Sequence, residues 1–157
     1  MDAIIKPANS DDAPAIADVY LSSRRLFIES YAPMMHNELD VRKWVARQLI
    51  PTANVWVAEL DGSVVGFMAT MSDRAFDWIE HLYLIPSAVG GGIGSQFVNL
   101  AKTESCRPIR LYTFQANQRS RQFYERHGFR PIKFSAGQSN EEQCPDVLYE
   151  WSDEAAN

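Results

Sequence analysis

The stretch LYLIPSAVGGGIGSQF, residues 82–97, decides the fold. Four glycines, Gly90, Gly91, Gly92 and Gly94, fall within five positions, between a run typical of a strand and a run typical of a helix. Glycine lets successive backbone N–H groups approach an anion, and a helix behind them adds a partial positive charge. The stretch therefore predicts a phosphate-binding turn. A flexible turn, or close packing of helix on strand, is the alternative.

The two common nucleotide motifs do not fit this turn. A dinucleotide fingerprint that began at Gly90 would need glycine at position 95, where the chain has Ser95. A P-loop would need a Gly-Lys-Ser/Thr sequence, which is absent. The strand before the turn also follows a hairpin instead of opening a β-α-β unit. We therefore expect a phosphate of another kind.

Working outward, the hydrophobic pattern predicts alternating strands and helices. Asp61-Gly62 is a strong hairpin turn signal between two runs with a period of two. Asn9 or Ser10 caps the first helix, and Asn117 caps the last one, which ends at Gly128. We expect strands at residues 3–7, 54–60, 63–71, 77–85, 108–115, 129–135 and 146–152, and helices at residues 9–23, 38–50, 92–105 and 117–128.

This order predicts an α/β fold of the mixed α+β kind. About seven strands form a mixed, mostly antiparallel central sheet, and about four helices cover both of its faces. The length of 157 residues suits one domain, residues 1–157. The last strand, residues 146–152, is either an exposed sheet edge that pairs in a homodimer or simply the final strand.

Composition narrows the class of partner. The net charge is −5 and Lys and Arg form no run, which argues against nucleic acid and suits a cationic or neutral small substrate. The N-terminus lacks the pattern of a secretory signal, and no apolar run is long enough for a membrane helix. We expect a cytoplasmic protein without a membrane partner. Cys106 and Cys144 lack metal-like spacing, so we expect reduced thiols and no metal.

Two motifs in order resemble those of the GCN5-related N-acetyltransferases, the GNAT family. The first follows Leu84-Ile85-Pro86 and runs from Val89 to Gly94, where the family has Arg/Gln-x-x-Gly-x-Gly/Ala. The second runs from Asn117 through Ser120, Phe123-Tyr124 and Gly128 to Phe129. The element order matches over nearly the whole chain, so the two motifs together are strongly specific.

The resemblance implies an acetyl-CoA site in a V-shaped opening between the fourth and fifth strands, at residues 78–84 and 109–115. Backbone groups of the fourth strand would pair with the pantetheine arm like an added strand, and one N–H near its end would polarise the thioester. Val89 departs from the family's Arg or Gln, which we expect to weaken CoA binding. The implied cofactor-binding residues are Leu82, Tyr83, Leu84, Val89, Gly90, Gly91, Gly92, Ile93, Gly94, Asn117, Ser120 and Tyr124.

Acetyl transfer to an amine requires a neutral amine, an oxyanion donor and a proton for the leaving thiolate. The resemblance makes Tyr124 the general acid, although a tyrosine at this place also suits simple core packing. Glu80 is the favoured general base, because a carboxylate among apolar neighbours has a raised pKa. His81 is the second candidate for the base, and the alternative for Glu80 is a structural ion pair with an arginine.

Strand alternation predicts two faces for residues 77–85. It places Trp78, Glu80, Leu82 and Leu84 on one face and Ile79, His81 and Tyr83 on the other, unless the strand carries a bulge.

We expect the acceptor to be a primary amine of a small molecule or peptide that attacks directly in a ternary complex. The resemblance places the segment between the two N-terminal helices beside the acceptor, so Tyr31, Met34, Met35 and His36 are candidate pocket residues. A loop packed on the sheet is the alternative for this segment. Two other functions stay open: a GNAT-fold module that senses CoA without turnover, and a nucleotide binder of another type.

Overall fold

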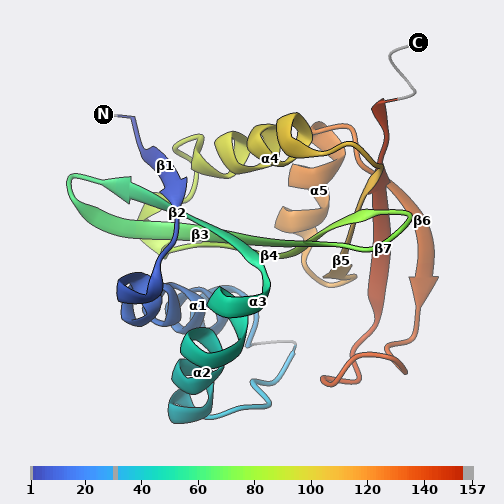
Figure 1. Cartoon of the computed structure of the whole chain (residues 1–157). Coiled ribbons are helices and arrows are strands. Elements are labelled where there is room, and N and C mark those ends of the chain that lie inside the picture. Colours follow the sequence, from blue (N-terminus) through green and yellow to red (C-terminus); the bar gives the residue numbers. More distant parts are fainter. Residues whose placement is uncertain (1, 30–31, 154–157) are drawn as a thin grey trace.

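A seven-stranded sheet lies between two layers of helices in the computed structural model, which describes residues 2–29 and 32–153 (Figure 1). The strands are β1 (Ile4–Pro7), β2 (Asn54–Leu60), β3 (Ser63–Ser72), β4 (Asp77–Leu84), β5 (Ile109–Phe114), β6 (Arg130–Ser135) and β7 (Asp146–Trp151). The helices are α1 (Ala13–Phe27), α2 (Glu38–Trp44), α3 (Ile50–Thr52), α4 (Ile93–Glu104) and α5 (Gln118–Arg126). Short turns of other helical types are η1 (Ser10–Asp12), η2 (Val45–Leu49) and η3 (Pro86–Ala88).

Local sequence signals explain where these elements begin. Asn9 caps the first helical turn: its side chain accepts from the Asp11 N–H at 2.8 Å, and the Asp12 carboxylate accepts from the Asn9 N–H at 2.9 Å. The hairpin between β2 and β3 turns at Asp61 and Gly62, both with positive φ. The predicted helix at residues 38–50 is interrupted by the π-helical turn η2.

The strand order is β1-β2-β3-β4-β5-β7-β6. Neighbours are antiparallel except for β4 and β5, which are parallel and pair only at Asp77↔Ile109 and Trp78↔Arg110 in the described chain. Beyond these pairs the two strands diverge, which confirms the predicted V-shaped opening. β7 lies between β5 and β6, so the suggestion that residues 146–152 form an exposed edge is wrong; β6 is the edge strand on this side of the sheet, and β1 lies at the other edge.

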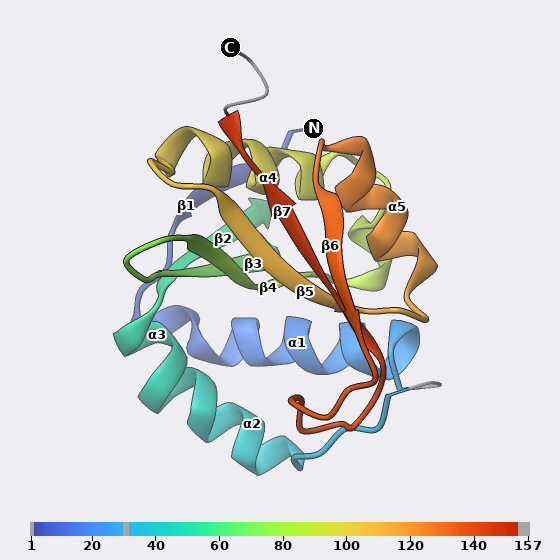
Figure 2. The same ribbon diagram turned by 90° about the vertical axis from the view of Figure 1, so that its right-hand side faces the viewer.

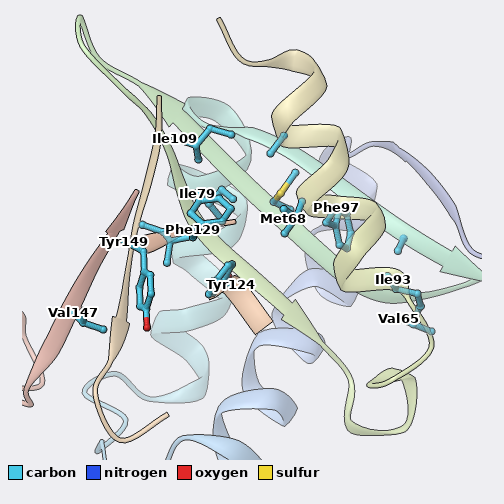
Figure 3. Packing of buried hydrophobic residues seen from close by; sticks show 14 residues of the cluster. Val65, Met68, Ile79, Ile93, Phe97, Ile109, Tyr124, Phe129, Val147 and Tyr149 are labelled. Atoms are coloured by element: carbon cyan, nitrogen blue, oxygen red, sulfur yellow. The ribbon is translucent and has the colours of Figure 1, made fainter. Parts of the chain in front are cut away.

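The two faces of the sheet carry separate cores. On one face, α1 and α2 cover β2 and β3 around Val57 and Phe67, below the sheet in Figure 1. On the other face, α4 and α5 lie above the sheet, and Phe97, Tyr124 and Tyr149 pack there with the residues shown in Figure 3. Within the described residues, no helix has both the length and the apolar character needed to cross a lipid bilayer.

A β-bulge falls at Glu80. The register between β3 and β4 runs from Ala69↔His81 directly to Thr70↔Ile79, so Glu80 has no partner on β3. Ile79 therefore packs on the α4 side together with Leu82, while His81 contacts rings on the α1 side. Strict alternation therefore does not hold for Ile79, because the extra residue reverses the faces along the strand, and the bulge named as the alternative in the sequence analysis is confirmed.

Candidate active site

A cavity of about 800 Å³ occupies the opening between β4 and β5. One end, which we call the cofactor end, is formed by the loop of residues 89–95 and by α5. The other, the acceptor end, is formed by the last turns of α1 and by residues 140–142 of the β6–β7 loop, which crosses α1 in Figure 2. The predicted residues that line the cavity are Glu80, His81, Leu82, Tyr83, Leu84, Val89, Gly90, Gly92, Gly94, Asn117, Ser120 and Tyr124.

The glycine loop needs glycine at defined positions. Gly90 and Gly92 have φ values of +90° and +89°, a conformation that L side chains rarely adopt. Gly92 precedes the first turn of α4 and provides no side-chain cap, so the first N–H groups of that helix have no partner within the helix. Gly91 has no positive φ and Ile93 is buried in the core; neither is part of the cavity lining.

Close packing explains the fourth glycine. A Cβ on Gly94 would lie 3.1 Å from the Phe123 ring, so glycine here lets α5 approach the start of α4. Val89 lines the cavity, but its N–H already donates to the Pro86 carbonyl over a long 3.4 Å. The amide of Val89 is therefore less available to an anion than those that follow it.

Tyr124 lies where α5 meets the cavity, with 8% of its surface exposed. Its ring packs against Phe123 and Phe129 at centroid distances of 5.1 Å and 5.6 Å. Burial raises the pKa of the Tyr124 phenol well above 10, with a smaller contribution from Tyr83. The hydroxyl consequently stays protonated at any physiological pH and can only donate a proton or a hydrogen bond to an anionic partner.

Asn117 combines two predicted features. Its Oδ1 accepts from the Ser120 N–H at 3.1 Å, which caps α5, and both residues line the cavity. The cap holds these polar side chains at the wall that faces β4.

The two candidate bases lie in contrasting environments. Glu80, on the bulge, has an exposed side chain, yet the cavity walls remove enough water to raise the pKa of its carboxyl. His81 lies among the rings of Tyr20 and Trp44, with centroid distances of 6.2 Å and 5.0 Å. Burial, followed by the charge of Arg24, lowers the pKa of His81 to about 4. Its Nδ1 is buried without a hydrogen-bond partner among the described residues.

The acceptor end contains a buried ion pair that sequence reasoning missed. Arg24 of α1 contacts Glu142 of the β6–β7 loop at 3.1 Å, with the two side chains 7% and 11% exposed. Arg24 also lies 3.5 Å from the Tyr83 hydroxyl. The partners are 118 positions apart, and no local pattern marks either residue.

The segment proposed for the acceptor lies at the rim of the cavity. His36 contacts Glu141 at 2.9 Å, and Glu141 lines the cavity although His36 does not. Met35 is half exposed and lies outside the lining, and Met34 packs against the α1–α2 core. Tyr31 lies outside the described residues.

Further residues of α5 also went unnoticed in the sequence. Arg119, Phe123 and Arg126 all line the cavity. Their spacing of four and three residues places them on one helix face, a signal that was available. The Arg119 guanidinium lies 4.6 Å from the centre of the Phe27 ring, which connects the start of α5 to the end of α1 across the opening.

Residues 51–131 match the family described as Acetyltransferase (GNAT) domain. The match covers slightly more than half of the chain, so the protein belongs to the GNAT family and is an acetyl-CoA-dependent N-acetyltransferase. The predicted resemblance is thereby confirmed.

Two curated relatives are similar over most of their length. The peptidyl-lysine N-acetyltransferase YiaC of Escherichia coli is 26% identical over 156 residues, covering 94% of this chain and 96% of the relative. An uncharacterized N-acetyltransferase of Archaeoglobus fulgidus is 29% identical over 132 residues, covering 76% and 88%.

Solved structures confirm the fold. The apo form of YjaB from Escherichia coli superimposes with a TM-score of 0.74 at 18% identity, covering 96% of this chain and 98% of that one. The PaiA N-acetyltransferase of Thermoplasma acidophilum, in complex with coenzyme A, has the same score, identity and coverage.

Proposed function

We propose that one domain, residues 1–157, transfers the acetyl group of acetyl-CoA to a primary amine by direct attack in a ternary complex. The observation that carries this proposal is the single cavity that brings together the glycine loop, the divergent strands and the Tyr124 phenol. Neither cysteine lines this cavity, which supports direct attack over a route through an acetylated thiol.

Acetyl-CoA binds at the cofactor end of the cavity. Its diphosphate is held by backbone N–H groups of residues 90–95, where the dipole of α4 adds partial positive charge. The pantetheine arm pairs with Leu82, Tyr83 and Leu84, because this part of β4 has lost β5 as a neighbour. Asn117 and Ser120 flank the arm from α5.

Tyr124 acts on the leaving group. A phenol that stays protonated places a hydrogen-bond donor beside the sulfur, where negative charge develops as the C–S bond breaks. The backbone N–H near Leu84 polarises the thioester carbonyl. The attacking amine nitrogen forms the new amide bond as the C–S bond breaks, and its proton passes to the base. The Tyr124 hydroxyl gives its proton to the leaving sulfur, so CoA leaves as the thiol, and the proton held by the base returns through water to Tyr124.

Glu80 is the base in this proposal, acting through water. Its raised pKa brings the carboxylate closer to the range where it can accept a proton and release it again. His81 is a weaker candidate, because a pKa of about 4 leaves it neutral and poorly basic at pH 7.

The acceptor is a lysine side chain of a peptide. Four carboxylates, Glu80, Glu141, Glu142 and Asp146, and three arginines, Arg24, Arg119 and Arg126, line the cavity. Among the ion pairs of the described residues, only Arg24 with Glu142 joins two of these groups. Negative charge at the cavity rim favours a cationic amine. The name of the Escherichia coli relative, a peptidyl-lysine N-acetyltransferase, supports the same class.

A second candidate is a CoA-sensing module with little turnover. The observation behind it is Val89, which departs from the Arg or Gln of the family pattern and can mark a member that has lost part of the family's machinery.

Initial-rate kinetics with a lysine peptide and acetyl-CoA test the proposal. We expect acetylated peptide, detected by mass spectrometry, and double-reciprocal lines that intersect. Parallel lines would overturn direct attack. Tight CoA binding with no acetylation of any amine in a panel of peptides and small amines would favour the sensing module.

A further inference from the structure

Ser95 and His127 form a hydrogen-bonded pair that joins the first turn of α4 to the end of α5. Ser95 Oγ lies 3.0 Å from His127 Nε2. Ser95 lines the cavity beside Gly94, whereas His127 lies behind it and is absent from the lining. A side-chain donor is thus present at the start of α4, at the place where the proposed function puts the diphosphate.

The imidazole of His127 is held firmly in place. Its ring packs at 4.6 Å on Phe123, the residue that fits against Gly94. The His127 N–H donates to the Tyr124 carbonyl at 3.0 Å, and its own carbonyl accepts from Lys102 Nζ at 2.6 Å. With backbone and ring both fixed, Nε2 has little freedom except to meet the Ser95 hydroxyl.

Two cations face this imidazole. Lys102 of α4 and Arg126 of α5 lie close to it, and together with burial, the largest cause, they lower the pKa of His127 below 6.5. The ring is therefore neutral near pH 7 without cofactor. A neutral Nε2 that carries no proton accepts a hydrogen bond from the serine hydroxyl.

An anion bound at Ser95 would reverse this balance. The diphosphate adds negative charge next to a group that only positive charge and burial keep deprotonated, and opposite charge stabilises the imidazolium. Protonated Nε2 donates to Ser95 Oγ, and the serine hydroxyl is then free to donate to a phosphate oxygen.

We propose that His127 is a positioning residue for CoA, which takes up a proton from solvent when the diphosphate binds and thereby turns the Ser95 hydroxyl toward it. The inference rests on the proposed place of the diphosphate. The pair also compensates for Val89. Ser95 supplies a hydrogen-bond donor and His127 a positive charge at a turn where the side chain of Val89 supplies neither.

Calorimetry with 3′-dephospho-CoA tests this inference. That ligand keeps the diphosphate but lacks the 3′-phosphate monoester, whose own second pKa of about 6 would confuse the result. Titrations at pH 7 in buffers of different ionisation enthalpy give the number of protons taken up. We expect net uptake, and a Kd that falls as pH falls from 8 to 6, by up to about tenfold per pH unit.

Variants separate the proton from the hydrogen bond. His127→Gln can still bond to Ser95 but cannot ionise, so we expect binding at pH 8 close to that of the native protein, without proton uptake. Ser95→Ala removes the hydroxyl and leaves α5 unchanged, and we expect weaker binding with reduced uptake. His36→Gln, at a histidine outside the cavity, is the matched control and should retain full uptake.

Two results would overturn the inference while the proposed function stands. One is binding by the native protein without proton uptake; the other is unchanged uptake in His127→Gln. Failure of the native protein to bind the ligand at all would overturn the inference and the placement of the diphosphate together.

Discussion

The two ends of the cavity are built from different materials. At the cofactor end, one short stretch of chain presents mainly backbone, namely glycines with positive φ and the first N–H groups of α4, and α5 adds side chains such as Asn117, Ser120 and Tyr124. The acceptor end presents side chains from distant segments, held by the buried Arg24–Glu142 pair and the exposed His36–Glu141 contact.

This difference distinguishes recognition of the diphosphate, which many sequences can provide, from recognition of the acceptor, which depends on particular side chains of this chain. Backbone amides recognise a diphosphate in any sequence that allows the turn, so the cofactor end is general. Carboxylates on a loop select their partner by charge and position, so under the proposed function the acceptor end would set specificity. A change at one end should therefore affect one substrate and leave the binding of the other nearly unchanged.

The largest effect on stability is expected at the acceptor end. Arg24→Met leaves Glu142 buried without its partner, and we expect the free energy of unfolding to fall by about 3 kcal/mol. Arg25→Met is the control, because Arg25 and Glu38 are 57% and 56% exposed and such surface pairs contribute less than about 1 kcal/mol. Denaturant titrations measure both. Equal losses would show that the Arg24 pair does not organise the acceptor end.

A double variant sharpens this test. Adding Glu142→Gln to Arg24→Met removes the uncompensated charge, so we expect it to recover part of the lost stability. In all three variants the affinity for acetyl-CoA should stay within about twofold of the native value, a change under 0.5 kcal/mol. The reason is that the substituted residues lie away from the cofactor end.

Tyr124→Phe should have the largest effect on turnover. Loss of the phenol removes the donor to the leaving sulfur, and general acids contribute about 100-fold or more to rates. We expect kcat to fall by about that factor while the Kd for acetyl-CoA, measured by calorimetry, changes little. A matching loss in both quantities would make Tyr124 a part of the cofactor scaffold instead of the acid.

Glu80→Gln should alter the pH profile. A base acts only when ionised, and the raised pKa of Glu80 places the loss of kcat/KM on acidification above the ordinary value of 4.5. In Glu80→Gln we expect the part of this acid limb that Glu80 sets to disappear, while the part set by protonation of the amine remains, with a rate up to about 100-fold lower at neutral pH. His81→Gln should keep the limb; its disappearance there would exchange the two assignments.

The smallest expected effect is a difference in the Kd for acetyl-CoA between alanine substitutions at two adjacent glycines. Gly90 has a φ of +90°, and alanine in this conformation costs about 1–2 kcal/mol. We expect Gly90→Ala to raise the Kd for acetyl-CoA about tenfold, since about 1.4 kcal/mol corresponds to that factor. Gly91→Ala, without positive φ and with its nearest contact at 3.7 Å, should be nearly neutral. Similar Kd values for both would argue against a backbone-built site.

The same contrast explains what the sequence could predict. The glycine turn, the Asn117 cap and the strand periodicities are local patterns, so the element order could be inferred from them. The diverging β4–β5 pair was implied only by the resemblance to the GNAT family. The partnership of Arg24 with Glu142 depends on the packed tertiary structure, which no local pattern encodes.

Two points that the sequence left open also depend on non-local geometry. The bulge at Glu80 is defined by the pairing of β3 with β4, and it moved Ile79 to the face opposite the one predicted. The position of β7 inside the sheet depends on β6 adding outside it, which strand periodicity alone does not reveal. Both concern the choice of neighbours and not the type of element.

A crystal structure of the protein with CoA tests the central claim most directly, because the claim concerns where the cofactor lies. We expect the diphosphate against the N–H groups of residues 90–95, the pantetheine arm along Leu82–Leu84, and the sulfur within hydrogen-bonding distance of the Tyr124 hydroxyl. A diphosphate bound away from the glycine loop, or a sulfur that does not reach Tyr124, would contradict the account.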